Sequence, residues 1–140
     1  MGTRKIGTYA LLKAVYDRLK AHDDTKDYNT YNNVPDDTEM PFIRVGDTTG
    51  GRSPQLGAQD IEGEENALTI HIWSDYLGDK EVEQMKNNVV QALTSSTISM
   101  TDSDYTNVIF LLDAHNTIID DTEPAHLVRH GWIRFICHMA

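Results

Sequence analysis

Cysteine, basic residues and long apolar runs are all scarce in this chain, and each scarcity excludes a class of protein. The single cysteine, Cys137, cannot form an internal disulfide and has no companion cysteines for a structural zinc site, so we expect a small core residue. No apolar run reaches the roughly 20 residues that a membrane-spanning helix needs. No apolar block of signal-peptide length follows the cations Arg4 and Lys5 either. The sequence therefore predicts a soluble protein that is neither anchored in a membrane nor secreted.

Basic residues are outnumbered, because 12 Lys and Arg face 22 Asp and Glu and give a formal net charge of −10. A general affinity for nucleic acid comes from Lys and Arg that displace counterions from phosphates, so this balance argues against a nucleic-acid-binding protein. The length of 140 residues suits one domain, residues 1–140, and a chain of this size buries roughly 70% of its unfolded surface. We expect one compact unit with its own core.

Two segments have the three- and four-residue apolar spacing of amphipathic helices. Residues 8–22 place one set of apolar side chains on a single helical face: Tyr9, Leu12, Val15, Tyr16 and Leu19. In the second segment, Asp79 can cap a helix whose positive first turn holds Glu81 and Glu83. The apolar stripe of this helix, which residues 94–97 close, consists of Val82, Met85, Val89, Ala92 and Leu93.

Four further segments are typical of strands. Residues 42–47 follow Pro41, which suits the start of a strand because no ladder donor is needed there. Residues 68–74 and 127–139 alternate between inward and outward side chains, the two-residue period of a strand with one buried face. Residues 107–113 are almost continuously apolar, which predicts a strand covered on both faces.

The glycine-rich segment at residues 48–65 has few bulky apolar side chains to offset the entropy of ordering its backbone, so it is predicted to be a long mobile loop. Residues 28–33 are interpreted as a connection, and residues 120–124 as a turn. The elements then follow the order α-β-β-α-β-β. The predicted fold class is α+β: a single domain with a mixed or antiparallel sheet of about four strands and two helices packed on one face.

Six histidines are the main candidates for chemistry: His22, His71, His115, His126, His130 and His138. Two or three imidazoles on one sheet face could meet a divalent ion. None, however, has the helical spacing and glutamate base of the metalloprotease motif, and His126 and His130 would lie about 13 Å apart on one strand. Residues 46–53 resemble a phosphate loop only in their glycines, because the Gly-Lys-Ser/Thr ending is absent. We assign no catalytic, cofactor-binding or metal-binding residue and expect no enzyme.

The order and spacing of four features resemble the tail-completion proteins of tailed bacteriophages. These features are Val34-Pro35, the strand Pro41-Phe42-Ile43-Arg44-Val45-Gly46, Ile72-Trp73-Ser74, and the helix from Gly78 to Leu93 with its Glu81-Val82 opening. Together with the leading helix and the closing strand pair, the resemblance covers nearly the whole chain. That family is similar in fold to phage tail-terminator proteins, which form hexameric rings capping the tail tube and provide the surface onto which the filled head docks.

The resemblance implies a structural virion protein that caps the tail tube, ends its growth and joins the tail to the head. Its partners would be copies of itself in a ring, expected to be a hexamer, together with the tail-tube protein and a head-completion or connector protein. DNA would pass through the ring without being bound specifically, since the acidic balance would leave the lumen negative. The protein would lie at the head-proximal end of the virion tail, and in the host cytoplasm before assembly.

Two sets of residues are predicted to make assembly contacts. A ring subunit needs two different complementary surfaces, for which a long loop and the sheet edges are candidates. In and beside the loop, the predicted contacts are Asp47, Thr48, Arg52, Gln55, Leu56, Asp60, Ile61 and Glu62. On the sheet face, the predicted contacts are Trp73 and Trp132. Two alternatives remain: a small binding or adaptor protein of phage or prophage origin, and a metal-dependent hydrolase that uses His71, His115 or His130.

Overall fold

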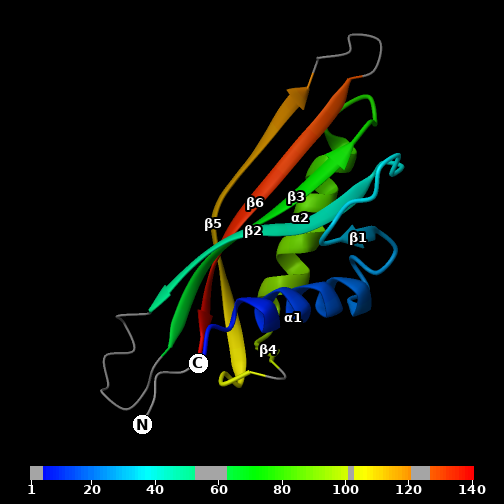
Figure 1. The fold of residues 1–140 in the computed structure, drawn as a ribbon. Helices are drawn as coiled ribbons and strands as arrows, with labels where there is room; N and C mark the ends of the chain where they lie inside the picture. Colours follow the sequence, from blue (N-terminus) through cyan, green and yellow to red (C-terminus); the bar gives the residue numbers. More distant parts are fainter. Residues whose placement is uncertain (1–4, 53–62, 101–102, 121–126) are drawn as a thin grey trace.

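The computed structural model describes residues 5–52, 63–100, 103–120 and 127–140 (Figure 1). Its elements are α1 (Thr8–Ala21), β1 (Asn29–Tyr31), β2 (Phe42–Arg52), β3 (Glu64–Ser74), α2 (Lys80–Thr94), β4 (Ile98–Ser99), β5 (Asn107–Asp120) and β6 (Val128–Met139). The strands form one sheet in the order β1-β2-β3-β6-β5-β4. The pair of β1 and β2 is parallel and the other neighbouring strands are antiparallel, so the sheet is mixed.

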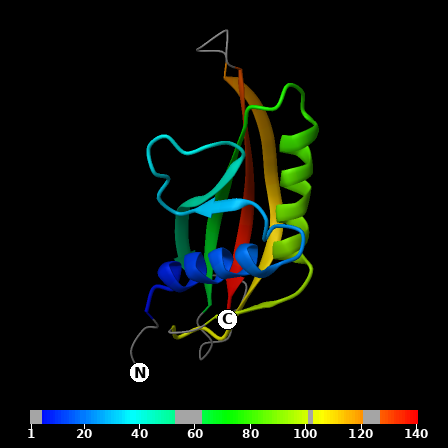
Figure 2. The ribbon, with the colours of Figure 1, turned by 90° about the vertical axis from the view of Figure 1, so that its right-hand side faces the viewer.

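Both helices lie on the same side of the twisted sheet, as predicted (Figure 2). α2 runs along the strands, whereas α1 crosses them near the end of the sheet at which the carboxyl terminus lies. Neither described helix has both the length and the apolar content that crossing a bilayer needs. The α+β fold class is confirmed, and one side of the sheet receives all of the helical packing.

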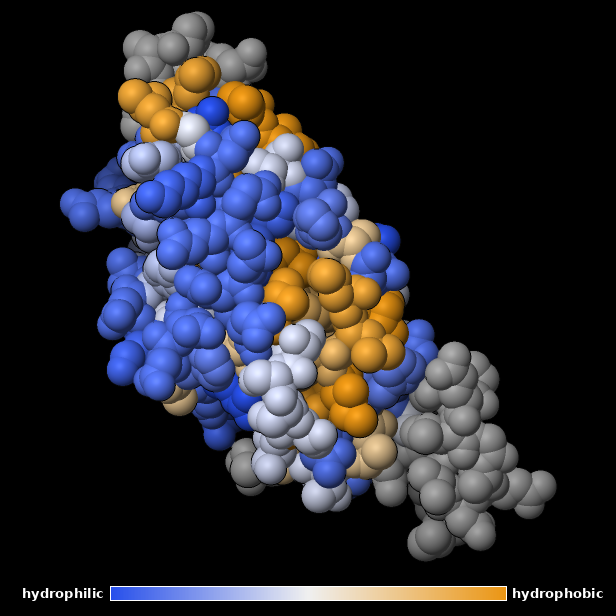
Figure 3. Space-filling view, turned by 180° about the vertical axis from the view of Figure 1, so that it is seen from behind, coloured by the Kyte–Doolittle hydropathy of each residue, from blue (hydrophilic) through white to orange (hydrophobic). Residues whose placement is uncertain are grey.

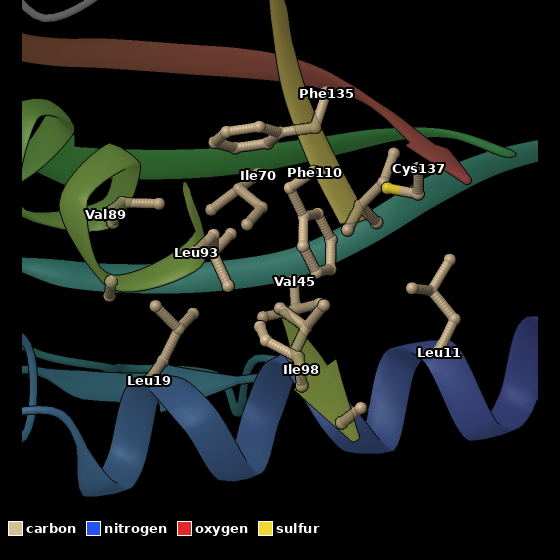
Figure 4. Packing of buried hydrophobic residues seen from close by; sticks show 14 of the residues in the cluster. Leu11, Leu19, Val45, Ile70, Val89, Leu93, Ile98, Phe110, Phe135 and Cys137 are labelled. Carbon is tan, nitrogen blue, oxygen red and sulfur yellow. The ribbon is translucent and has the colours of Figure 1, made fainter. Parts of the chain in front are cut away.

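The core fills the space between the helices and the sheet (Figure 4). Its fully buried side chains come from both helices and the four long strands, and include Leu11, Leu19, Val45, Ile70, Val89, Leu93, Phe135 and Cys137. Burial of one such large aliphatic or aromatic side chain contributes about 1.5–3 kcal/mol. Burial also raises the pKa of the Cys137 thiol to about 12, and the prediction of a small core cysteine is confirmed.

The buried stripe of α1 differs from the one that the sequence predicts. Tyr9 is 78% exposed and Tyr16 is also exposed, although both were expected on the core face. Their places are taken by Ala10 and Ala14, which are buried beside Leu11. Small alanine side chains let the helix pack closely, while the tyrosines keep their hydroxyl groups in water.

The prediction of about four strands is wrong, because the sheet has six. The two additional strands are β1, within the segment interpreted as a connection, and β4, directly after α2. They have three and two residues, too few to show a two-residue period. Each pairs with the end of a long edge strand, so tertiary contact rather than local sequence defines them.

The predicted loop at residues 48–65 is also partly wrong. Residues 48–52 continue β2, and residues 64 and 65 begin β3, so ten residues of β2 pair with β3. Gly50 is required by this pairing, since a Cβ atom there would lie 2.6 Å from Oδ1 of Asn66. Glycine weakens a strand in isolation, but close approach of the neighbouring strand explains its presence here. Residues 53–62 lie outside the described residues.

The strand predicted at residues 107–113 is twice as long in the structure and continues to Asp120, which the sequence placed in a turn. A β-bulge between Leu112 and Ala114 leaves Asp113 without a partner residue in β6. The polar stretch that follows Asp113 therefore belongs to the same strand. Its side chains face water or α2, which explains why it has no apolar pattern.

Asp79 occupies the position before α2, as expected, but its side chain does not cap the helix. Its Oδ1 atom accepts a hydrogen bond from Nε of Arg129 at 2.7 Å instead. Arg129 also donates to the backbone oxygen of Tyr76 at 3.1 Å, so it fastens the start of α2 to β6.

Candidate assembly interface on the uncovered face of the sheet

We call the side of the sheet opposite the helices the uncovered face, because no described helix or strand lies over it (Figures 1 and 2). Side chains of β3 alternate strictly between buried and partly exposed along its whole length. The partly exposed set points to the uncovered face and includes His71 and Trp73. In β6 the corresponding set includes His130, Trp132 and Ile136.

The apolar run of β5 is covered on one face only, so the prediction of a strand covered on both faces is wrong for the single chain. Five of its large side chains are between 48% and 52% exposed: Ile109, Leu111, Leu112, Ile118 and Ile119. The pairing with β6 places Ile109, Leu111 and Ile118 on the uncovered face. Seen from behind, the molecule shows a band of apolar side chains beside a hydrophilic surface (Figure 3). Contiguous exposed apolar surface of this kind marks a site of protein contact.

Two tryptophans and two histidines form a block at the centre of the uncovered face. The register of β3 with β6 sets His71 opposite Trp132 and Trp73 opposite His130. The rings of Trp73 and His130 are stacked, with centroids 4.4 Å apart and planes inclined by 3°. Trp73 also stacks on Phe42 of β2 at 5.2 Å. Stacked rings fix one another's rotamers, so Phe42, Trp73, His71 and His130 form a rigid part of the surface.

A chain of hydrogen bonds joins the two imidazoles of the block to a carboxylate. Nε2 of His71 lies 2.7 Å from Oδ2 of Asp47, and Nδ1 of His71 lies 2.8 Å from Nε2 of His130. Only one of the two nitrogens in the second contact can carry a proton, because a hydrogen bond needs one donor and one acceptor. The contact is therefore compatible with at most one charged imidazole.

The pKa values of this chain shift in a direction that agrees with its geometry. The hydrogen bond from His71 holds the pKa of Asp47 below its ordinary value, and Arg44 acts in the same direction. Burial lowers the pKa of His130, and the positive charges of His71 and Arg44 lower it further. Asp47 therefore remains an anion, and His130 a neutral ring, to a lower pH than the same groups in an unfolded chain.

Two β-bulges frame the uncovered face, and each contains an aspartate paired with an arginine. Asp47 forms the bulge in β2, and its Oδ1 atom lies 3.0 Å from Nη2 of Arg44. Asp113 forms the bulge in β5 and accepts from Nε of Arg134 at 2.7 Å. The bulge in β2 faces two residues of β3, and the bulge in β5 faces two residues of β6. These two pairs of residues lie directly opposite each other, so both bulges lie in one row across the sheet.

The three histidines of the metal-dependent alternative do not all come together. His71 and His130 lie on the uncovered face, whereas His115 lies on the helix side, where its Nδ1 accepts from Nζ of the buried Lys86 at 3.0 Å. Lys86 also pairs with Glu83 and donates to Thr117, so its donors are occupied. No group of three or more His, Cys, Asp or Glu side chains is arranged to hold a metal within the described parts of the chain.

The predicted contact residues have different outcomes. Asp47, Thr48 and Arg52 belong to β2 at one edge of the sheet, and Trp73 and Trp132 lie on the uncovered face. Five others lie outside the described residues: Gln55, Leu56, Asp60, Ile61 and Glu62. Sequence reasoning missed the contact of His71 with His130 and the exposed half of β5. The uninterrupted apolar run from Val108 to Leu112 was the available signal for the second.

The fold and this surface define a class of protein: a small α+β domain with one open, partly apolar sheet face, suited to assembly with other proteins. Residues 13–135 match the family model described as tail completion protein gp17. The chain therefore belongs to the tail completion protein gp17 family, a family of structural proteins of the phage virion.

Solved structures show the same fold. A protein chain in a structure of the virion of a native gene transfer agent (GTA) particle superposes with a TM-score of 0.69 at 17% sequence identity. The match covers 95% of this chain and 97% of that chain. No curated protein matches the sequence.

Proposed function

We propose that this protein caps the phage tail tube, ends the growth of the tube and joins the tail to the head as a ring of identical subunits. The observation that carries the proposal is the match of residues 13–135 to the tail completion family. The likeness in fold to a protein of a gene transfer agent virion agrees with it, since that protein is part of an assembled particle.

The exposed half of β5 supports a role in assembly over a role in catalysis. An apolar strand with water on one face has about half of its burial energy still to gain. A neighbouring subunit or the tail tube would remove Ile109, Leu111 and Ile118 from water. The block of Trp73, His130, His71 and Trp132 would give that contact a rigid aromatic centre, which is typical of strong protein interfaces.

The proposed ring has six copies, with the tail-tube protein on one side and a head-completion or connector protein on the other. It would lie at the head-proximal end of the tail, after assembly from subunits in the host cytoplasm. DNA would pass through the bore without specific binding, because a charge of −10 per subunit repels phosphates. Assembly contacts would involve the edge of β2 at Asp47, Thr48 and Arg52 and the sheet face at Trp73 and Trp132.

Electron microscopy of particles produced without this gene tests the proposal. We expect filled heads that carry no tails beside tail tubes of uncontrolled length. A plasmid copy of the gene should restore joined particles, which controls for effects on neighbouring genes. Normal virions in the absence of the gene would refute the proposed function.

A further inference from the structure

The sheet has two free edges in the described part of the chain, on opposite sides. β4 pairs only with the first two residues of β5, so residues 109–119 have no described strand on their outer side. β1 pairs only with the first three residues of β2, so residues 46–52 are free as well. A free edge presents a row of unpaired N–H and C=O groups, and its natural partner is another strand.

The polarity of the long strands makes these two edges suited to each other. β2, β3, β6 and β5 are neighbours in that order, and each pair is antiparallel. β2 and β5 therefore run in opposite directions. When two copies are related by rotation about an axis along the strands, β5 of one copy meets β2 of the next as an antiparallel pair. Repetition of this heterologous contact gives a ring if the rotation closes.

The side chains of the two edges are complementary in size. On the uncovered face, the free part of β5 carries the large residues Ile109, Leu111 and Ile118. At the levels of Ile109 and Leu111, β2 carries Gly51 and Thr49, whereas Ile118 is level with Phe42, where β1 already pairs with β2. No atom of the described residues lies within 4 Å of a Cβ atom built on Gly51, so there is open space beside this glycine.

Charge opposes pairing of β5 with itself but not pairing of β5 with β2. The free stretch of β2, residues 46–52, contains one arginine and one aspartate, a net charge of zero. β5 contains two aspartates and no Lys or Arg, a net charge of −2 with its histidine neutral. Neither free stretch contains the lysines or prolines that commonly block pairing between sheet edges. Pairing of β5 with β2 therefore meets no net repulsion, whereas pairing of β5 with itself brings like charges together.

We propose that the free edge of β5 in one copy pairs with the free edge of β2 in the next copy, so that one continuous antiparallel sheet runs around the ring. This inference rests on the proposed function, because it names the junction between the subunits of the proposed ring. Copies at the same height place Ile109 of one subunit beside Gly51 of the next, and Leu111 beside Thr49. Ile109 and Leu111 of β5 then lie beside small residues of β2.

Disulfide cross-linking of paired cysteine variants tests the junction in the full-length chain. Gly51→Cys is combined in turn with Ile109→Cys, Leu111→Cys and Ile118→Cys, so that three registers are sampled. A bond within one chain is impossible, since three strand spacings, about 14 Å, separate β2 from β5 and a disulfide requires Cα atoms less than about 7 Å apart. The native Cys137 is fully buried and does not compete.

We expect one double variant, with Ile109→Cys as the first candidate, to give a ladder of covalent oligomers that ends at the size of the ring. Each single cysteine variant is its control and should remain monomeric on a denaturing gel. Covalent dimers from either single variant would show pairing of like edges and would overturn the inference. Rings in the electron microscope with no cross-link in any register would also overturn it, while leaving the proposed function intact. Normal virions without the gene would refute the proposed function and the junction together.

Two bulky substitutions distinguish a subunit contact at the edge of β2 from a contact on the uncovered face. Gly51→Tyr fills the open space at the edge of β2, so we expect loss of rings from a subunit with unchanged circular dichroism and melting temperature. Ala67→Tyr, at the same face but on the central strand β3, is the matched control and should still form rings. The reverse result would assign the contact to the centre of the uncovered face and overturn edge pairing.

Discussion

Leu111 and Phe110 are neighbours in β5 that point to opposite sides of the sheet. Substitutions at these two positions therefore distinguish packing in the core from the proposed contact with other subunits. Phe110 is buried in the core, whereas Leu111 and Ile109 are about half exposed on the uncovered face. Full burial of such an aliphatic side chain contributes about 1.5–3 kcal/mol, so each has about 0.75–1.5 kcal/mol left to gain on assembly. For the two together, the gain amounts to about 2 kcal/mol, or roughly a 30-fold change in the dissociation constant.

The double variant Ile109→Ala, Leu111→Ala should therefore weaken the association of subunits about 30-fold. We expect the free energy of unfolding of the dilute subunit to fall by no more than about 2 kcal/mol, because half of each side chain is in water already. Phe110→Ala is the matched control, and it should lower the free energy of unfolding by about 3–5 kcal/mol. Urea denaturation at low protein concentration gives the free energy of unfolding. Sedimentation velocity over a concentration series gives the strength of association.

Equal losses of subunit stability in the double variant and in Phe110→Ala, with association unchanged, would contradict this reasoning. That result would mean that the uncovered face is packed within the subunit itself. A loss of association in Phe110→Ala at concentrations where the subunit remains folded would contradict it too.

Three further predictions concern protonation, packing and thiol chemistry. Folding lowers the pKa of His130 from 6.5 and the pKa of Asp47 from 3.8, so the unfolded chain binds more protons than the folded chain. The free energy of unfolding should therefore fall as the pH drops below about 6.5, and again near and below 3.8. His130→Gln removes the first of these losses, and melting temperatures of both proteins at pH 7.0 and 5.5 check it; an equal fall in both would rule out His130. Gly131→Ala places a Cβ atom 2.9 Å from Cγ2 of Val82 and should cost about 1–3 kcal/mol in urea denaturation, whereas Gly51→Ala should cost much less. The thiol of Cys137, with its pKa of about 12, should react with a thiol reagent at pH 8 only after unfolding, and rapid labelling of the native protein would disprove its burial.

Local patterns in the sequence were sufficient for the elements whose side chains follow a regular period. α1 and α2 follow the helical spacing of their apolar residues, and β3 and β6 alternate along their length. β1, β4 and the glycine-rich end of β2 could not be predicted in this way. They are strands because a neighbouring strand pairs with them, and that neighbour is distant in the sequence or contributes only a few residues.

The candidate interface was predictable in part. The alternation of β3 and β6 places Trp73 and Trp132 on the face away from the core, and the structure has them there. The contact of His71 with His130 depends on the register between strands that are 59 residues apart, which no local pattern contains. The apolar run of β5 predicted a strand covered on both faces, but the structure covers only the inner face.

The alignment of the two bulges has a consequence for the shape of an assembled collar. Each bulge bends its own strand, and because both lie in one row the bends add into a single crease that crosses the strands. In the proposed ring, a wall of such creased panels with strands along the axis would open like a funnel, with a narrow rim at one end and a wider rim at the other. That shape would suit the proposed connection of a slender cylinder to a broader opening, and the two aspartate–arginine pairs would hold the angle of its flare.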